Sequence, residues 1–218
     1  ITTGSKYRRL GVDGETDYLG AGVHFCATCD GPFYRGKNVA VIGGGNSATE
    51  ESLLLTKFAD KVTMIVRGDS FTASQVIQEK VLSEPKIDVL WNTEVEQFKG
   101  ADSKLNTLKL TNNQTDEKKE LPIDGTFIFI GLDPNTRFLQ ETAVELDEWG
   151  FVVTGHTLVH DQAPPPPFNG REPEFLETSV PGIFAAGDVR AESTKQVASA
   201  AGEGATAALL IREYLKTV

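Results

Sequence analysis

The stretch "NVAVIGGGNSATEESLLLTKF", residues 38–58, decides the fold class. It opens with the apolar run "VAVI", which is typical of a parallel strand buried on both faces. Three glycines, residues 43–45, follow at once, and residues 46–58 place apolar side chains near helical spacing. Because "KVTMIVRG" (61–68) resembles the next strand, we expect a strand, glycine turn, helix, strand unit, and therefore an α/β fold.

The glycine turn fits the dinucleotide-binding pattern G-x-G-x-x-G/A, with alanine in the last position. Such a turn brings the backbone close to a pyrophosphate and presents free N–H groups at a helix N-terminus. A glycine-rich turn without a ligand is the alternative, and the position between a strand and a helix argues against it. The residues expected to bind the nucleotide are Gly43, Gly45, Asn46, Ser47 and Ala48.

The residue after the second strand distinguishes NADP from NAD in such units. Arg67 stands there, followed two residues later by Asp69. An arginine at this place favours the 2′-phosphate of NADPH, whereas an acidic side chain would bind a ribose hydroxyl group. Arg67 could instead be an ordinary solvated surface residue.

The only two cysteines of the chain, Cys26 and Cys29, are three residues apart, and Asp30 follows directly. A zinc site needs four ligands, and the histidines that could complete one, His156 and His160, lie on a strand-like segment. We therefore expect no metal. Two inert thiols remain possible. A redox dithiol is favoured, because a C-x-x-C motif lowers the pKa of one thiol and Asp30 can exchange a proton with it.

Composition excludes several classes of protein. The 218 residues contain 21 Lys and Arg against 31 Asp and Glu, a net charge of −10, which argues against a nucleic-acid partner. No apolar run approaches a membrane span, so we expect no membrane contact. Two cysteines and no signal peptide favour a cytoplasmic location. The chain opens with Ile, and we expect it to be a fragment.

The remaining segments suggest further elements. Residues 86–100 resemble two short strands, and residues 104–131 a hairpin that returns to the buried strand "TFIFI" (126–130). "WGFVVTGHTLVHD" (149–161) is strand-like, and "GIFAAGDVR" resembles a strand and a turn. "VASAAGEGATAALLIREYL" is a helix rich in small residues. Residues 155–174, with four consecutive prolines, should form an exposed and mobile loop.

Three motifs together resemble the low-molecular-weight thioredoxin reductases. They are "CATCDG", "GGGNSATEE" and "GIFAAGDV", in this order, and the similarity covers essentially the whole chain. The resemblance implies two doubly wound, Rossmann-like domains. Residues 22–126 would be the NADPH domain with the dithiol, and residues 1–21 and 127–218 would be parts of the FAD domain. The glycine turn of the FAD domain is missing, so we expect that domain to be incomplete and truncated at its N-terminus.

The resemblance also implies an activity, a flavin-dependent thioredoxin-disulfide reductase. Electrons would pass from NADPH through FAD to the dithiol and on to thioredoxin or a similar protein disulfide. Cys29 corresponds to the thiol beside the flavin, Cys26 to the thiol that attacks the protein substrate, and Asp30 to the acid–base. The full-length protein would be a homodimer, and the chain alone is expected to be inactive.

The same resemblance implies residues for the flavin site. Gly187 and Asp188 correspond to the contact with the ribityl chain of FAD. Lys195, Gln196 and Val197 stand where the family has Arg-Gln-Ala against the flavin.

A departure from the family pattern keeps other functions open. The family's His-Arg-Arg-x-x-x-Arg clamp is reduced here to Arg67 alone, so NADH is possible in place of NADPH. The reduced clamp also leaves open an FAD-dependent dithiol oxidase on the same fold. A further alternative is a nucleotide-binding redox module without turnover.

Overall fold

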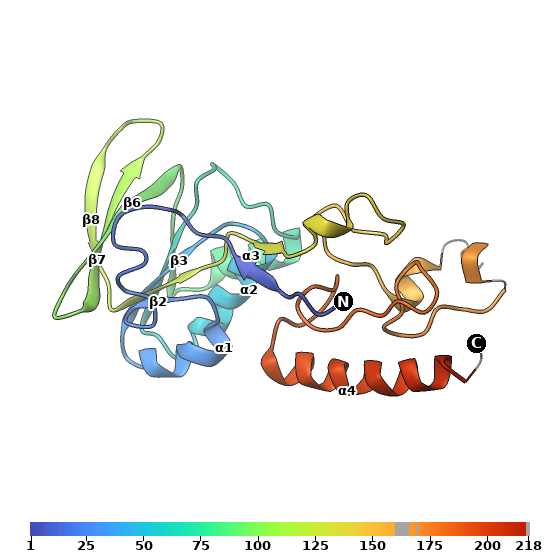
Figure 1. Cartoon of the computed structure of the whole chain (residues 1–218). Helices are drawn as coiled ribbons and strands as arrows, with labels where there is room; N and C mark the ends of the chain where they lie inside the picture. The colour runs from blue at the N-terminus through green and yellow to red at the C-terminus, as the bar shows by residue number, and fades with distance from the viewer. Residues whose placement is uncertain (160–165, 169, 217–218) are drawn as a thin grey trace. The chain divides into compact units, whose positions relative to one another are not determined.

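The computed structural model describes residues 1–159, 166–168 and 170–216. The chain divides into two compact units, one of residues 7–131 and one of residues 1–6 with 132–218 (Figure 1). The boundaries of the cofactor domains given above remain a prediction. We call the two parts the sheet unit (residues 7–131) and the C-terminal unit.

The sheet unit is built on a five-stranded parallel sheet. The strand order is β2 (Val23–His24), β9 (Gly125–Ile128), β3 (Asn38–Ile42), β4 (Lys61–Ile65) and β5 (Ile87–Leu90). All four strand pairs are parallel, and the β3–β4 ladder begins with Asn38 opposite Lys61. The α/β class and the parallel sheet expected from the sequence are therefore confirmed.

Helix α2 (Asn46–Leu55) follows the glycine turn, as expected, and packs beside α3 (Gln75–Ser83), which the sequence did not predict. An apolar cluster with Phe127, Leu55 and Met64 joins these helices to the sheet. A second cluster, with Phe98 and Leu108, packs between the parallel sheet and a smaller antiparallel sheet. The parallel strands are therefore covered on both faces, which explains their near-continuous apolar sequence.

The smaller sheet contains β6 (Thr93–Ala101), β7 (Lys104–Asn112) and β8 (Lys118–Pro122), paired antiparallel in that order. This confirms the predicted hairpin between residues 104 and 122. Between β2 and β3 lie a short helix α1 (Ala27–Asp30) and the 3₁₀ helix η1 (Gly31–Tyr34). Both lie in the blue part of Figure 1, directly after the first strand of the parallel sheet.

Elsewhere β1 (Ser5–Tyr7) pairs with β10 (Leu132–Pro134). The C-terminal unit has three 3₁₀ helices, η2 (Arg137–Leu139), η3 (Gly155–Leu158) and η4 (Pro166–Phe168), within its described residues. Its one long helix is α4 (Val197–Tyr214), drawn in red in Figure 1, which confirms the predicted small-residue helix.

Two predicted strands in this unit are wrong. Within residues 149–159, the described part of the first, only Val152 makes β-bridges, and His156 lies on η3. In "GIFAAGDVR" the ladder contacts are isolated bridges at Phe184 and Arg190. The amide groups of Ala185 and Ala186 donate instead to the carbonyl oxygens of Leu176 and Ile1. An extended segment forms a strand only when a second strand lies beside it. The neighbours of these two segments are irregular, so neither segment forms a strand.

The prediction of an exposed loop at 155–174 is wrong in part, because Gly155, Leu158, Phe168 and Pro173 are buried. His160 and the proline run up to residue 165 lie outside the described residues. In the described part of the chain no helix is both long and apolar enough to cross a membrane.

Candidate active site

The two cysteines form a disulfide at the start of α1. The sulfur atoms lie 2.09 Å apart and the Cα atoms 5.3 Å apart. Cys26 is the N-cap residue of the helix, and its sulfur accepts a hydrogen bond from the backbone N–H of Cys29 at 3.1 Å. Cys29 is the more exposed of the two. Among the described residues no group of three or more His, Cys, Asp or Glu side chains could hold a metal ion.

Asp30 takes part in a buried polar chain that sequence reasoning missed. Its Oδ2 lies 3.1 Å from Nδ1 of His24, and Nε2 of His24 lies 2.6 Å from the hydroxyl group of Tyr34. Burial lowers the pKa of His24, although the Asp30 carboxylate opposes this. Burial, with Asp30 and Asp124, raises the pKa of Tyr34 to about 12. The position of His24, two residues before Cys26, was the only available signal.

The glycine turn connects the end of β3 with α2. Gly43 has φ +137°, and a Cβ atom there would collide with the carbonyl oxygen of Phe129, so only glycine fits. At Gly44 a Cβ atom would come within 2.9 Å of Cγ1 of Val66. Gly45 is the N-cap residue of α2 and offers no side chain to the helix end. The turn therefore leaves backbone N–H groups available for a ligand's oxygen atoms.

The five residues predicted to bind the nucleotide all lie at this turn, and they differ in their exposure to solvent. Asn46 and Ser47 are exposed and Ala48 is buried. The side-chain oxygen of Asn46 accepts a hydrogen bond from the backbone N–H of Ser74 at 2.8 Å. Asn46 therefore connects the turn to the residue that precedes α3.

Arg67 follows β4 at the same edge of the sheet, and its side chain is exposed. Its carbonyl oxygen accepts a hydrogen bond from the amide group of Asn113 at 2.9 Å, which holds the backbone there. Oδ1 of Asp69 accepts one from the hydroxyl group of Ser70 at 3.0 Å. Arg67 and Asp69 are therefore both exposed, in the segment that follows β4.

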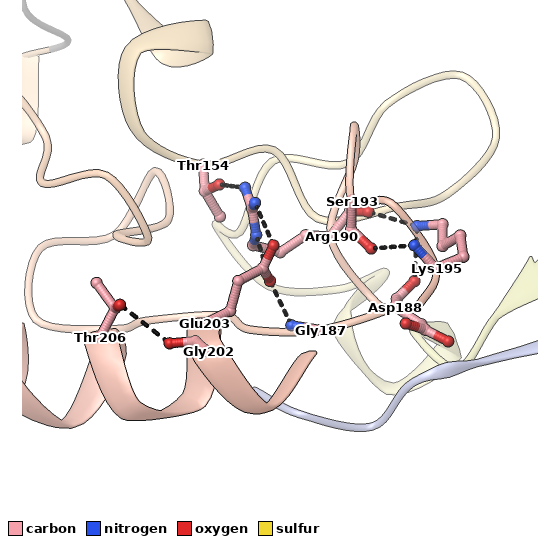
Figure 2. A network of polar contacts seen from close by, with 9 residues as sticks. All are labelled: Thr154, Gly187, Asp188, Arg190, Ser193, Lys195, Gly202, Glu203 and Thr206. Carbon is pink, nitrogen blue, oxygen red and sulfur yellow. Dashed lines mark hydrogen bonds and ion pairs between the residues drawn. The ribbon is translucent and has the colours of Figure 1, made fainter. Parts of the chain in front are cut away.

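In the C-terminal unit a second polar network surrounds Gly187 (Figure 2). The Arg190 guanidinium group binds the Glu203 carboxylate at 2.9 and 3.2 Å and donates to the Thr154 hydroxyl at 2.6 Å. Glu203 also accepts the backbone N–H of Gly187 at 2.6 Å. Burial raises the pKa of Glu203, but the hydrogen bonds from Arg190 and Gly187 outweigh it and keep this pKa below its ordinary value.

The predicted flavin residues lie around this network. The Lys195 ammonium group donates to the carbonyl oxygens of Asp188 at 2.9 Å and Arg190 at 2.7 Å, and burial lowers its pKa. Gln196 is the N-cap residue of α4, and Val197 is 88% exposed. No hydrogen bond joins the Asp188 carboxylate to the other residues drawn in Figure 2. Sequence reasoning missed Glu203 as the partner of Arg190, because thirteen residues separate them.

The parallel βαβ unit with its glycine turn defines an α/β protein of the dinucleotide-binding type as the class, and a disulfide lies in the same unit. The pyridine nucleotide-disulphide oxidoreductase family matches residues 1–204, and the chain belongs to this family.

Its relatives include thioredoxin reductases. That of Treponema pallidum is 42% identical over 100% of this chain and 64% of its own length. That of Schizosaccharomyces pombe is 41% identical over 99% of this chain and 62% of its own. The chain thus spans less than two-thirds of these relatives.

Solved structures agree with this similarity. The thioredoxin reductase of Streptococcus pyogenes has a TM-score of 0.84 and 36% identity, with 100% of this chain and 65% of that chain covered. That of Giardia duodenalis has a TM-score of 0.86 and 34% identity, with 99% and 65% covered. The resemblance inferred from the three motifs is therefore confirmed.

Proposed function

We propose that this chain carries the dithiol and the nucleotide site of a flavin-dependent thioredoxin-disulfide reductase. The observation that supports this most directly is the Cys26–Cys29 disulfide, which lies in the same unit as the Gly43 turn and is followed by Asp30. The similarity to relatives named thioredoxin reductase supports the same function. The full-length protein would be a cytoplasmic homodimer.

The proposed reaction of the cysteines is thiol–disulfide exchange. In the reduced pair, the Cys26 thiolate attacks one sulfur of the substrate disulfide and the other substrate sulfur leaves as a thiolate. The Cys29 thiol then attacks Cys26 in the mixed disulfide, which releases the reduced substrate and restores the Cys26–Cys29 bond. Asp30 would give and take the protons that the sulfur atoms exchange. Two electrons thereby move from the cysteine pair to the substrate, thioredoxin or a similar protein.

The nucleotide would bind at the turn of residues 43–48. The close-packed glycines let a pyrophosphate approach the backbone, and the N–H groups at the start of α2 face its negative charge. A bound nicotinamide nucleotide supplies a hydride. Arg67 would hold a 2′-phosphate, so NADPH is the proposed donor. The preference over NADH should be small, because one exposed cation contributes about 1 kcal/mol at most.

The flavin would lie against the Gly187 turn. The residues there fit an FAD ribityl chain, since Asp188 offers a half-buried carboxylate and Glu203 fixes the Gly187 backbone beside it. A bound flavin supplies a two-electron carrier between nicotinamide and disulfide. Gln196 and Val197 would lie at its edge. Lys195 would hold the Asp188 backbone in place, because its ammonium group donates a hydrogen bond to the Asp188 carbonyl oxygen.

A trapping experiment tests the roles of the two thiols. The reduced variant Cys29→Ser keeps the attacking thiol and should form a stable mixed disulfide with oxidised thioredoxin, visible on a non-reducing gel. The matched variant Cys26→Ser should trap at least several-fold less, and the double variant none. Equal trapping by both single variants, or by neither, would overturn the assignment.

A further inference from the structure

A buried hydrogen-bonded chain joins the disulfide's neighbour Asp30 to the interior of the sheet unit. His24, on β2, is 9% exposed, and its two ring nitrogens face Asp30 at 3.1 Å and Tyr34 at 2.6 Å. The rings of Tyr34 and Phe127 lie 5.3 Å from the imidazole ring. Rotation of the imidazole would leave buried polar atoms without partners, which costs about 1–3 kcal/mol per group. Both contacts of His24 are therefore held in place.

The chemistry of the two partners fixes the direction of these hydrogen bonds. Oδ2 of Asp30 is an acceptor both in the carboxylate and in a carboxylic acid that carries its proton on Oδ1, so Nδ1 of His24 carries the proton that points at Asp30. Nε2 then has a lone pair and accepts the hydroxyl proton of Tyr34. Burial supports this arrangement, since it lowers the pKa of His24 and raises that of Tyr34 to about 12. The chain of hydrogen bonds therefore runs from the Tyr34 hydroxyl group to His24, and from His24 to Oδ2 of Asp30.

Other charged groups surround this chain without replacing its contacts. Asp124 acts on Tyr34 through space, and the Lys37 ammonium group lies 5.3 Å from the centre of the Tyr34 ring. Lys37 and Lys104 also line the pocket that contains Asp30, His24 and Tyr34. Both nitrogens of His24 already have partners, so these charges affect the chain electrostatically and do not bond to the imidazole.

We propose that His24 is a positioning residue for Asp30, which it holds beside the disulfide through Nδ1–H with Tyr34 as anchor. The Asp30 side chain is 33% exposed and would otherwise turn freely into water. The contact uses Oδ2 and leaves Oδ1 as the oxygen that carries a proton to the leaving sulfur. This inference rests on the proposed function, which makes Asp30 the acid–base.

Reduction of the disulfide by dithiothreitol isolates this step without flavin or nucleotide. Asp30 first takes a proton from solvent on Oδ1. A dithiothreitol thiolate then attacks one cysteine sulfur, the Cys26–Cys29 bond breaks, and Asp30 passes this proton to the leaving sulfur. The second dithiothreitol thiol then closes its own ring disulfide and releases the other cysteine. Two electrons pass from dithiothreitol to the cysteine pair.

The experiment measures this rate in the full chain between pH 5.5 and 8.5, corrected for the thiolate fraction of dithiothreitol. Two variants separate the contacts of His24. The amide of His24→Asn can reach the position of Nδ1 and keep the bond to Asp30, whereas that of His24→Gln can reach only the position of Nε2. Asp30→Asn should be about 100-fold slower. His24→Gln should be about tenfold slower, with a weaker dependence on pH, and His24→Asn within about threefold of wild type.

A double variant and a second anchor variant complete the test. His24→Gln with Asp30→Asn should be no slower than Asp30→Asn alone, because the two residues act as a unit. Tyr34→Phe, which keeps the ring, should slow the rate about threefold and provides the test if His24→Gln does not fold. A wild-type rate in Asp30→Asn would overturn the acid–base role itself. A slow Asp30→Asn with a normal His24→Gln, or His24→Asn as slow as His24→Gln, would overturn this inference alone.

Discussion

The sheet unit and the C-terminal unit are stabilised in different ways. In the sheet unit, two apolar clusters cover the two faces of a parallel sheet, and Phe98, Phe127 and Met64 are fully buried. In the C-terminal unit the apolar clusters are small, and a carboxylate, Glu177, is buried completely. One unit is therefore packed around large apolar clusters, whereas the other combines small apolar clusters with buried ion pairs.

The ion pairs replace backbone contacts that a sheet would supply. Glu177 binds both Nη atoms of Arg171 at 2.7 Å and accepts the backbone N–H groups of Glu174 and Gly182. Glu203 accepts hydrogen bonds from Nε and Nη2 of Arg190 and from the backbone N–H of Gly187. Where few strands pair, carboxylates satisfy buried N–H groups, and a buried carboxylate needs a cation in turn. The two units should therefore respond to different perturbations.

The largest expected effect is that of Phe127→Ala in the sheet unit. The substitution removes a fully buried ring and should lower the free energy of unfolding of this unit by about 3–5 kcal/mol. Fluorescence of Trp91, which packs on Phe71, reports on this unit in urea titrations of a Trp149→Phe background. Fluorescence of Trp149 in a Trp91→Phe background reports on the C-terminal unit and should shift less, and equal shifts of both signals would mean that the units unfold together.

Arg190→Ala should have the next largest effect, in the C-terminal unit. The Arg190 and Glu203 side chains are 9% and 12% exposed, so removal of the cation leaves a poorly compensated carboxylate. We expect a loss of about 3 kcal/mol in stability. The control Arg190→Met with Glu203→Leu replaces both charges and should be much less destabilising. A loss in the control as large as in Arg190→Ala would show that the uncompensated charge is not responsible.

A smaller effect is expected from pH. Hydrogen bonds to Arg171 and Arg190 keep the pKa of Glu177 and of Glu203 below the ordinary value of 4.5, although burial opposes them. Their stabilisation is complete above pH 4.5 and is lost as the pH falls through the folded-state pKa. In the sheet unit burial, and then Glu50, raises the pKa of Glu51, so protonation of Glu51 favours folding. The C-terminal unit should therefore unfold first in acid.

Acid titrations followed by Trp149 fluorescence and by Trp91 fluorescence, each in the background that lacks the other tryptophan, measure this order. Glu203→Gln removes one of the two titrating groups and should reduce the acid sensitivity of the C-terminal unit at the cost of some stability at pH 7. Earlier loss of the Trp91 signal would contradict the comparison between the units.

The sequence by itself determined the βαβ unit, the nucleotide turn, the cysteine pair and the family. Each depends on residues close together in the chain: an apolar run, three glycines before a helix, and two cysteines three apart. Local spacing is enough for these features because backbone periodicity and covalent proximity create them.

The tertiary structure alone decided which extended segments became strands and which side chains met. The segment "TFIFI" lies between β2 and β3 and pairs with both, and it forms β9. Phe184 makes only an isolated bridge, because irregular segments lie beside it. His24 is hydrogen-bonded to Tyr34, and Arg190 to Glu203. The path of the chain between the two residues of each pair cannot be predicted from a local sequence pattern. A strand needs a neighbouring strand, and a buried charge needs a partner. Both are supplied by packing between segments that are distant in sequence, and only the folded chain brings these together.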